Sequence, residues 1–450
     1  MTYLYNGYIA VIGGSVAGSE AAFQLAEKGY KVAVFDQLAL PYGKIEDGLP
    51  KWHIKLRDKE EDLIDQKLQH PNIRFIPKCR LGKDIEFEAL INEWNFSAIL
   101  LAIGAWKDRE LEIPGISRFL NKGLIYQNPL IKWFNHYHES DYEGPRYDIP
   151  DGAIVIGGGL ASIDVIKIAQ IYTVQKALKE RGINEDIFTL ERGIDRVLEK
   201  HGLNMHDLGL KGATLIYRKS ARDMPLKSFD KAEDEEKARE VSEKMLRISM
   251  DRYKFNFMPN SVAVKALIEH DKLVGLEFQK TIVKDGQSIP IEGSEFEFRS
   301  PLIISSIGSL PEHIEGIPVK NNLLNTIRKG ACRIKGYDHV FAIGNAVTGR
   351  GNIKESRIHG KESVDRIFDQ HLDPKKAQFQ TILRTLETKV NEQIGEISSQ
   401  LNSRKILTEE DIISIDQKID ELQDNVGYDG NYMAWKSEHL WQRLEAMNEK

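Results

Sequence analysis

A chain of 450 residues is too long for a single hydrophobic core, and its 41% of apolar residues can fill two or three domains. The 62 basic and 68 acidic residues leave a net charge of −6, which excludes a whole-molecule attraction to nucleic acid or anionic membranes. Cys79 and Cys332 are the two cysteines of the sequence, so a CxxC pair, a four-cysteine zinc site and a four-thiolate iron–sulfur cluster are excluded.

The first predicted elements are an apolar strand over residues 8–12, a glycine turn over 13–18 and a helix over 19–28. A second strand follows and ends in Asp36, 23 residues after the first glycine of the turn. In this order of elements, the free N–H groups and the dipole of the helix N-terminus hold a pyrophosphate. Asp36 stands where an acid bonds the hydroxyls of an adenosine ribose, and Ser15 replaces the middle glycine of the usual motif.

The same order returns in the middle of the chain, with a strand over 153–156, a turn over 157–162 and a helix that runs through Ala169. Two such units in one chain predict two bound dinucleotides. Ser162 departs from the glycine or alanine that usually closes the motif.

Arg218 and Lys219 end the next strand of this second unit, where the first unit carries an acid. A ribose 2′-phosphate needs cations at this point, so the pair favours NADPH over NADH. The alternative is that both are ordinary solvated side chains at a strand end. A helical insertion over 173–208 accounts for the long gap that precedes Arg218.

Three further apolar strands are each followed by glycine. Gly104 and Gly308 follow the first two, which we expect where the chain passes between domains. Gly344 and Gly351 follow the third and allow a close approach of the backbone to a ligand. Taken singly, each strand could equally be an ordinary buried strand with a tight turn.

The ordered set of motifs is more specific than any one of them. It comprises GGSVAG, LPYGKIEDGLPKWH, LGKDI, AIGAWKDRELEIPG, GGGLASIDV, YRKSARDMP and GNAVTGRGNI. Over about residues 8–368 the chain resembles the adrenodoxin-reductase-type ferredoxin–NADP⁺ reductases, which are related to the glutamate synthase small subunit. The resemblance implies an α/β fold with two Rossmann-like three-layer dinucleotide-binding domains. The NADP domain is inserted into a discontinuous FAD domain. The tail has no counterpart in the family, and its own residue pattern predicts a helical C-terminal appendage.

The resemblance implies FAD and NADP(H) as cofactors, and it assigns candidate positions to each. Those for FAD are Gly13, Ser15, Val16, Ala17, Gly18, Asp36, Gly43, Leu81, Gly104, Gly344, Asn345, Gly351, Asn352 and Ile353. Those for NADP(H) are Gly157, Gly159, Leu160, Ala161, Arg218 and Lys219. Asn345 stands where relatives carry Asp or Trp, and no metal site is predicted.

The family also implies two catalytic candidates, His53 and Asp164. Tyr42, Gly43, Gly48 and His53 keep the family's spacing, and the family's histidine lies near the flavin with a role in proton handling or partner-domain coupling. Asp164 matches an acid of the NADPH turn. The alternative for His53 is a hydrogen-bonded structural histidine, and that for Asp164 is an acid on a helix surface. The residues PKW before His53 depart from the family pattern.

The function that the resemblance implies is hydride transfer from NADPH to FAD, followed by single-electron transfer to ferredoxin or flavodoxin. One alternative is a glutamate-synthase-like electron-entry subunit of a larger enzyme, although such subunits usually carry a cysteine-rich N-terminal domain. Another is a non-catalytic flavin or NADPH sensor, or an assembly scaffold. A disulfide reductase is disfavoured because the sequence offers no redox-active dithiol.

The last 78 residues are predicted to be helical. An apolar stripe comprises Phe379, Ile382, Leu386, Val390, Ile397 and Leu401. A capping box at Thr408 and Asp411 starts a second helix, with which the stripe would form a hairpin. An aromatic-rich last helix would carry Tyr432, Trp435, Trp441, Leu444 and Met447. This tail could pack on its own core, on a second copy of the chain as a homo-oligomer, or on a partner.

The predicted domains are an FAD domain over 1–114 and 317–372, an NADP domain over 115–316, and a helical extension over 373–450. A local basic patch, which could steer a small acidic electron carrier, comprises Lys211, Arg218, Lys219, Arg222 and Lys227. We expect no nucleic-acid or membrane partner. No apolar run reaches about 20 residues and no signal peptide precedes the first strand, so we expect a cytoplasmic protein.

Overall fold

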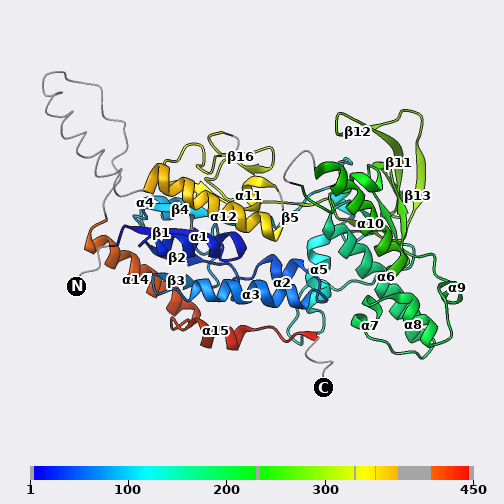
Figure 1. Ribbon diagram of the computed structural model, residues 1–450, viewed down its shortest axis with the longest axis horizontal. Helices are drawn as coiled ribbons and strands as arrows, with labels where there is room; N and C mark the ends of the chain where they lie inside the picture. The colour runs from blue at the N-terminus through cyan, green and yellow to red at the C-terminus, as the bar shows by residue number, and fades with distance from the viewer. Residues whose placement is uncertain (1–4, 230–233, 329–330, 350, 373–406, 445–450) are drawn as a thin grey trace. The chain divides into compact units, whose positions relative to one another are not determined.

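The computed structural model describes residues 5–229, 234–328, 331–349, 351–372 and 407–444 (Figure 1). Contacts within the chain divide it into two compact units. The first unit comprises 1–46, 54–107 and 310–442, and the second comprises 47–53, 108–309 and 443–450. Both units are therefore discontinuous in sequence. The domain limits predicted above remain a proposal, and the contacts group the helices after residue 406 with the first unit.

The first unit is built on a five-stranded parallel sheet with the strand order β18-β4-β1-β2-β3. Its strands are β1 (Tyr8–Ile12), β2 (Lys31–Phe35), β3 (Ile73–Ile76), β4 (Ala98–Leu101) and β18 (Val340–Ala342). The register of β1 with β2 runs from Tyr8 opposite Lys31 to Ile12 opposite Phe35. All residues of β1 are buried, as expected for a parallel strand covered on both faces.

Helices pack around this sheet. They are α1 (Val16–Glu27), α3 (Ile54–Leu68), α4 (Phe87–Asn92), α11 (Asn345–Thr348), α12 (Ile353–Ile367), the π-helix η4 (Phe368–Leu372), α14 (Glu409–Val426) and α15 (Tyr432–His439). Helix α1 packs against α12 and α3, and α14 packs against β3 (Figure 1). A small antiparallel pair, β16 (Val319–Lys320) and β17 (Leu323–Leu324), completes the unit. The helices at the end of the chain are thus part of the first unit.

The second unit repeats the arrangement with a parallel sheet of order β6-β14-β7-β8-β9. Its strands are β6 (Leu124–Tyr126), β7 (Ile154–Ile156), β8 (Thr214–Ile216), β9 (Asn256–Met258) and β14 (Ile303–Ser305). Its helices are η1 (Ile116–Phe119), α5 (Gln127–His136), α6 (Leu160–Glu180), α7 (Ile187–Glu191), α8 (Ile194–Lys200), α9 (Met205–Leu208), η2 (Ala221–Asp223) and α10 (Glu235–Tyr253). Three short elements lie where the chain changes unit: α2 (Lys44–Gly48), β5 (Lys107–Asp108) and β15 (Ser309–Leu310).

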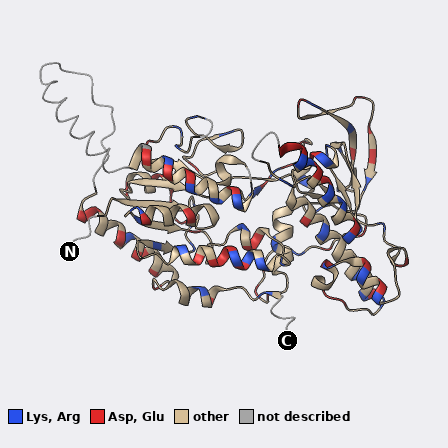
Figure 2. Cartoon of the chain, in the orientation of Figure 1, with Lys and Arg blue, Asp and Glu red and all other residues tan. Residues whose placement is uncertain are grey.

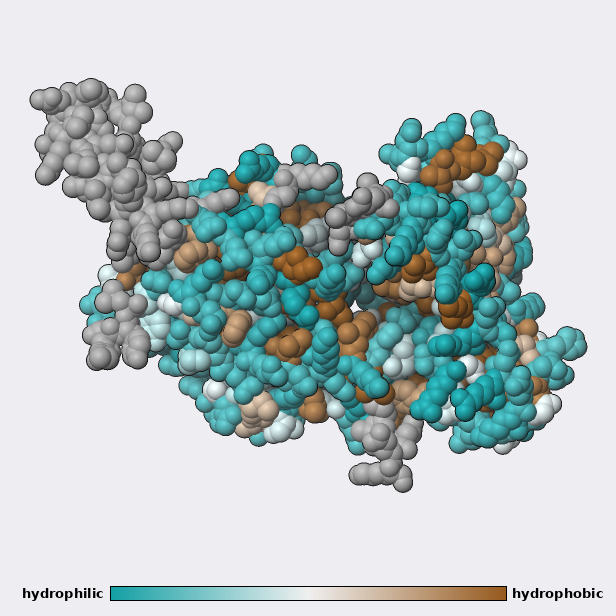
Figure 3. Space-filling model, in the orientation of Figure 1, coloured by the Kyte–Doolittle hydropathy of each residue, from teal (hydrophilic) through white to brown (hydrophobic). Residues whose placement is uncertain are grey.

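An antiparallel sheet extends the second unit and was not anticipated from the sequence. It comprises β10 (Ser261–Glu269), β11 (Lys272–Lys284), β12 (Gln287–Pro290) and β13 (Phe296–Arg299). Ile282 and Ile289 face each other across β11 and β12, and with Ile291 they remain about two-fifths exposed. They belong to the hydrophobic patch seen over β12 (Figure 3).

The α/β fold with two parallel sheets and a helical C-terminal segment is confirmed. The predicted helical insertion is also observed, because α6 continues to Glu180 and α7 to α9 follow before β8. The capping box at Thr408 and Asp411 starts α14 as predicted. The last helix is shorter than predicted: α15 ends at His439 because Leu440 adopts extended backbone, so Trp441 and Leu444 lie outside it. The stripe over 379–401 and Met447 fall outside the described residues.

Residues with charges of both signs are interspersed along α3 and α10 (Figure 2). Helix α10 contains the charge-rich stretch after residue 233, and most of its side chains face solvent. Among the helices in the described part of the chain, none combines the length and the apolar character needed to cross a bilayer.

Candidate functional site

The first glycine turn joins β1 to α1. Gly13 has a φ of 99°, which favours glycine, and its N–H donates to the carbonyl of Phe35 at 2.7 Å. A Cβ on Gly18 would lie 1.7 Å from the carbonyl oxygen of Gly13, so helix and turn can approach this closely only with glycine. Ser15 is the N-cap of α1, and among the described residues its side chain makes no cap hydrogen bond. The N-terminal N–H groups of α1 are therefore available to an anion.

Asp36 lies directly against this turn rather than in solvent. Its carboxylate accepts hydrogen bonds from the backbone N–H of Gly14 at 2.8 Å and of Leu38 at 2.9 Å. Burial raises the pKa of Asp36 to about 6, although these two hydrogen bonds oppose the rise. Asp36 is thus hydrogen-bonded to the first turn, at the position where the sequence predicts a contact with the ribose.

The loop after β2 packs on the same turn. The Ser15 hydroxyl donates to the carbonyl of Tyr42 at 3.0 Å, and a Cβ on Gly43 would lie 3.2 Å from the Ser15 side chain. Gly43 has a φ of 53° and Gly104 a φ of 66°, and the Trp106 ring lies within 4 Å of the Cβ position of each. The structure thus brings two predicted cofactor positions to one aromatic side chain, which the sequence reasoning did not single out.

The segment after β18 also meets the first turn. A Cβ on Gly344 would lie 2.9 Å from the Cβ of Ala17, so these two predicted positions adjoin. The Oδ1 atom of Asn345 is buried and has no hydrogen-bond partner among the described residues. Asn352 caps α12 by accepting from the N–H groups of residues 354 and 355, and Ile353 is the first residue of that helix. Leu81 lies in the hydrophobic core of the first unit.

The second glycine turn joins β7 to α6. The N–H of Gly157 donates to the carbonyl of Ile216 at 3.1 Å, as Gly13 does to the end of β2 in the first unit. Gly159 is the N-cap of α6, with no side-chain cap bond from the described residues, and a Cβ there would meet no atom within 4 Å. Ser162 is fully buried and donates to the carbonyl of Ser306 at 2.8 Å. Leu160 and Ala161 form the first turn of this helix.

Both turns fit a dinucleotide diphosphate. Elsewhere in the chain, Asp186, Asn204 and Thr408 cap the N-termini of α7, α9 and α14 with their side chains. Helices α1 and α6 lack such caps within the described chain, as do α4, α5, α8 and α10, but α1 and α6 are the two that follow the predicted glycine turns. The open N–H groups and the glycine next to them are the features that phosphate binding requires.

The cations predicted at the end of β8 differ in their surroundings. The side chain of Arg218 is exposed, and its carbonyl accepts from the hydroxyl of Thr281 at 2.6 Å. The Lys219 ammonium donates to the carbonyl of Gly286, at the tip of the β11–β12 hairpin. Arg222, from the predicted basic patch, pairs with the acids of α10, including Glu236. The patch is therefore partly neutralised within the chain, and Arg218 is left exposed beside the second turn.

His53 and Asp164 lie together within the second unit. The Nε2 atom of His53 is 3.1 Å and 3.2 Å from the two carboxylate oxygens of Asp164, and the indole N–H of Trp52 lies 3.4 Å from the first of them. The Lys167 ammonium is 3.9 Å from the same oxygen and 3.0 Å from Glu191. Trp52 and Lys167 were missed from the sequence, although Lys167 follows Asp164 by one helical turn.

The segment that carries His53 is anchored by an ionic cluster of the second unit. The His136 ring lies between two carboxylates, 3.0 Å from Asp47 and 2.7 Å from Glu139. Burial disfavours the charged ring, but the hydrogen bonds to these acids outweigh it and raise the pKa of His136 to about 9. The ammonium of Lys132 adds a third contact to Asp47 at 2.9 Å. The cluster holds the start of the segment against α5.

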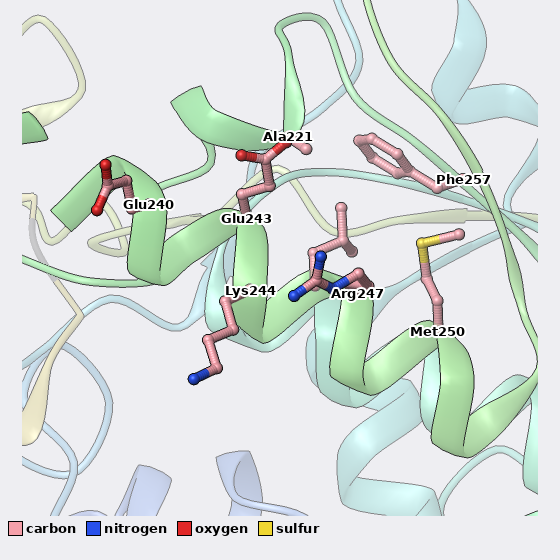
Figure 4. Close-up of a pocket in the computed structure, with 8 residues that line it drawn as sticks. Ala221, Glu240, Glu243, Lys244, Arg247, Met250 and Phe257 are labelled. Carbon is pink, nitrogen blue, oxygen red and sulfur yellow. The ribbon is translucent and has the colours of Figure 1, made fainter. Parts of the chain in front are cut away.

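A surface pocket of about 280 Å³ lies on the second unit beside α10 (Figure 4). The residues that line it are Ala221, Glu240, Glu243, Lys244, Leu246, Arg247, Met250 and Phe257. None of them is a predicted site residue, and the charges of the two acids oppose those of the two bases. Both cysteines, Cys79 and Cys332, are free and buried, and burial raises the pKa of the Cys79 thiol to about 12.

The predicted residues divide between the two units. The first unit holds Gly13, Ser15, Val16, Ala17, Gly18, Asp36, Gly43, Leu81, Gly104, Gly344, Asn345, Gly351, Asn352 and Ile353. The second unit holds His53, Asp164, Gly157, Gly159, Leu160, Ala161, Arg218 and Lys219.

Comparison with known proteins gives relatives over most of the chain. NADPH-Fe(3+) oxidoreductase subunit beta of Geobacter sulfurreducens is 25% identical over 324 residues, which are 68% of this chain and 38% of that protein. The mitochondrial NADPH:adrenodoxin oxidoreductase of Arabidopsis thaliana is 23% identical over 343 residues, 69% of each chain. This chain therefore spans about two-fifths of the length of the first relative.

A solved structure, that of Mycobacterium tuberculosis FprA in complex with NADPH, shares the fold. It superposes over 93% of this chain and 90% of that one, with a TM-score of 0.64 and 17% sequence identity. The family profile described as pyridine nucleotide-disulphide oxidoreductase matches residues 7–360, which is well over half of the chain. The cofactors that these findings support are FAD and NADP(H). The chain belongs to the pyridine nucleotide-disulphide oxidoreductase family.

Proposed function

We propose that this chain is an NADPH-dependent flavoprotein reductase that passes electrons to a ferredoxin or a flavodoxin. The observation that carries the proposal is the pair of glycine turns, one in each unit, with the uncapped helices α1 and α6 behind them. Opposite charges stand at the two strand ends, Asp36 in the first unit and Arg218 in the second. An acid suits the free ribose of FAD, and an arginine suits the 2′-phosphate of NADPH.

The residues divide between the two cofactors accordingly. The turn over 13–18 would hold the diphosphate of FAD, with Gly344 beside it. The next residue is Asn345, whose Oδ1 has no hydrogen-bond partner among the described residues and could accept from a donor on the cofactor. The turn over 157–162 would hold the diphosphate of NADPH, with Arg218 on the 2′-phosphate. Once bound, the two cofactors supply the hydride and single-electron chemistry, and the protein supplies position and electrostatics.

His53 and Asp164 are proposed to handle a proton. When the His53 ring carries a proton on Nε2, that N–H donates to the carboxylate of Asp164, 3.1 Å away. The indole N–H of Trp52 fixes the same carboxylate from another side. The ring of His53 is about one-third exposed, so its proton can exchange with water while Asp164 orients it.

Two observations support a one-electron carrier rather than a disulfide as acceptor. The Arabidopsis relative is named for its action on adrenodoxin. Both cysteines are free and buried, and the raised pKa of Cys79 keeps that thiol protonated. A disulfide acceptor would need a reactive thiolate pair next to the flavin.

An anaerobic titration tests this function. NADPH should bleach the bound flavin near 450 nm faster than NADH, and the reduced protein should then reduce ferredoxin or flavodoxin but not a disulfide substrate. A purified protein that neither retains nor rebinds FAD, or whose flavin NADPH cannot reduce, would refute the proposal.

The variant Gly159→Ala tests the second turn alone. Its Cβ meets nothing in the protein, so the unfolding midpoint should stay unchanged. A bound diphosphate would meet the added methyl group, and we expect the KM for NADPH to rise about tenfold. The FAD content serves as the internal control. An unchanged KM would place the dinucleotide away from this turn.

A second candidate is an electron-entry subunit of a larger enzyme, of the kind found in glutamate synthase. It is favoured by the Geobacter relative, which is named as a subunit and is much longer than the matched region. Native purification from the source organism distinguishes the two. A stable partner that carries the substrate chemistry supports this candidate, whereas activity of the isolated chain with a free carrier supports the first.

A non-catalytic sensor or scaffold is the third hypothesis, and the tail motivated it. The described part of the tail packs on the first unit: Asp416 contacts Lys31, and the Gln423 amide donates to the carbonyl of Phe75. These contacts favour packing on the chain's own core over a free docking arm. NADPH oxidation by the purified protein would rule the sensor out.

A further inference from the structure

Asp65 on α3 joins three segments of the first unit that are far apart in sequence. Its side chain is buried, and each carboxylate oxygen has its own donor from the end of the chain. The Tyr432 hydroxyl donates to Oδ1 and the Lys436 ammonium to Oδ2, both at 2.5 Å. The Tyr42 hydroxyl lies 3.0 Å and 3.2 Å from the two oxygens. One carboxylate therefore bridges helix α15 and the loop at Tyr42.

The loop over 41–43 is the one that packs on the first glycine turn. Tyr42 accepts from the Ser15 hydroxyl through its carbonyl while its own hydroxyl donates to Asp65. A Cβ on Gly14 would lie 2.7 Å from the Cβ of Pro41, so the loop touches the turn at a second point. A continuous path of hydrogen bonds thus runs from α15 through Asp65 and Tyr42 to the N-cap of α1.

Helix α15 is itself fixed on the first unit. The Trp435 indole donates to the carbonyl of Ala39 at 2.8 Å, and the Tyr432 ring packs edge-on against Phe75 with centroids 5.5 Å apart. The Gln423 amide of α14 donates to the carbonyl of Phe75 at 2.6 Å. These contacts lie within the first unit, so α15 offers Asp65 donors in a set position.

We propose that α14 and α15 complete the FAD-binding unit, and that Tyr432 and Lys436, acting through Asp65, are positioning residues for Tyr42 and the loop on the phosphate turn. The ligand's identity rests on the proposed function, whereas the path of contacts does not. The tail is then a working part of the cofactor site, although its sequence lies outside the family match at 7–360.

The chemistry of the cluster explains why both donors matter. Burial raises the pKa of Tyr42 and of Tyr432 well above the usual range, so both phenols stay protonated and donate. Lys436 supplies the positive charge opposite the buried carboxylate. Removal of either α15 donor leaves the largely buried carboxylate with one donor fewer, so the Tyr42 hydroxyl is drawn to the oxygen that has lost its partner and the loop shifts with it.

The test compares conservative side-chain changes in the full-length protein. Tyr432→Phe and Lys436→Met are expected to raise the Kd of FAD for the apoprotein about tenfold, measured by quenching of flavin fluorescence. Lys436→Arg keeps the charge and the donor and should stay within about twofold. Tyr428→Phe is the matched control, because Tyr428 also packs edge-on against Phe75 and does not contact Asp65.

A double variant tests the route. In a Tyr42→Phe background, where the hydroxyl link is already absent, Tyr432→Phe should add little further loss of FAD affinity. The proposal is overturned if the folded variants bind FAD as the parent does, or if the losses of the two changes simply add.

Hydrogen exchange of the apoprotein separates this inference from the proposed function. The N–H groups of Ile45 and Glu46 donate to the carbonyls of Tyr42 and Gly43, so they report on the loop without FAD. Both should exchange faster in Lys436→Met than in Tyr428→Phe. If the parent binds no FAD, the proposed function fails, and equal exchange in the two variants would refute the positioning role on its own.

Discussion

The two glycine turns build the same backbone approach by different means. In each, the first glycine lies against the backbone carbonyl just after a neighbouring strand, β4 in the first unit and β14 in the second. A Cβ on Gly13 would be 2.5 Å from the carbonyl oxygen of Ala102, and one on Gly157 would be 2.2 Å from that of Ser306. The first turn then needs Gly18, whose Cα abuts the turn itself. The second turn accepts Ser162, which donates a hydrogen bond to Ser306. A helix can thus approach its glycine turn closely either because a residue has no side chain, as at Gly18, or because a small side chain is hydrogen-bonded there, as at Ser162.

The strand ends next to the turns differ in burial as well as in sign of charge. Asp36 is buried and accepts two backbone N–H groups, whereas Arg218 is exposed. The acid of the first site is therefore buried and ordered by its own hydrogen bonds, while the second site keeps its cation exposed. Variants at these positions test whether the two sites differ in this way.

Gly18→Ser, which copies the second turn into the first, should have the largest effect. Its Cβ would meet the carbonyl oxygen of Gly13 at 1.7 Å, so the backbone must move. We expect the free energy of unfolding to fall by roughly 3 kcal/mol or more and the FAD content to collapse. Urea unfolding followed by circular dichroism measures the first, and absorbance of the purified protein measures the second. A parent-like midpoint would show that the two turns are interchangeable.

The raised pKa of Asp36 predicts that the stability of the protein depends on pH. Its folded pKa of about 6 exceeds the ordinary value of 3.8, so the native state holds the proton more tightly than the unfolded chain. Its contribution is therefore fully present below about pH 4 and is lost as the pH rises through 6, by an amount on the order of 3 kcal/mol.

Asp36→Asn should remove this dependence. The quantity to measure is the difference in free energy of unfolding between the parent and variant apoproteins, from pH 4 to pH 7.5. It should shift in favour of the variant as the pH rises. A difference that stays constant over this range would mean that Asp36 ionises normally in the folded protein.

Arg218→Ala tests the exposed cation of the second turn. The KM for NADPH should rise about tenfold to fiftyfold, while kcat/KM for NADH should change by less than about threefold. Lys227→Ala, another exposed member of the predicted basic patch, is the matched control. Equal losses with both nucleotides would show that Arg218 does not contact the 2′-phosphate.

Ser162→Ala should have the smallest effect. It removes one buried hydroxyl-to-carbonyl hydrogen bond, and we expect a loss of about 1 kcal/mol in the free energy of unfolding. Ser249→Ala removes an exposed hydrogen bond to the carbonyl of Met245 and should cost less. If both variants unfold like the parent, the hydroxyl does not hold the second turn together.

The sequence was informative where local order determines structure. The bounds of β1 are as predicted, because an apolar strand before a glycine turn is a short-range signal. Helix α1 begins at Val16, three residues earlier than predicted. The turn is complete at Ser15, and the last residues of the glycine motif already belong to the first turn of the helix. The family's spacing pointed to His53 and Asp164 separately, but their pairing, and the contribution of Trp52 to it, depend on fold-level contacts.

Long-range contacts could not be predicted in this way. Asp65 is one acid in a charge-rich helix, and no sequence pattern links it to Tyr432, 367 residues later. The sheet from β10 to β13 was missed because its strands carry many charged residues and little unbroken apolar sequence. The inward turn of Asp36 toward Gly14 likewise depends on three-dimensional packing rather than on spacing.

The contact between Tyr8 and Asp416 has a consequence for biosynthesis. The two residues are 408 positions apart, yet the hydroxyl of the first donates to the carboxylate of the second at 3.0 Å. At translation rates of about 5–20 residues per second, the ribosome needs roughly 20–80 s to make the chain between them. During that interval the nascent first sheet lacks its covering helix, so the start of the central strand β1 stays uncovered until α14 has been made.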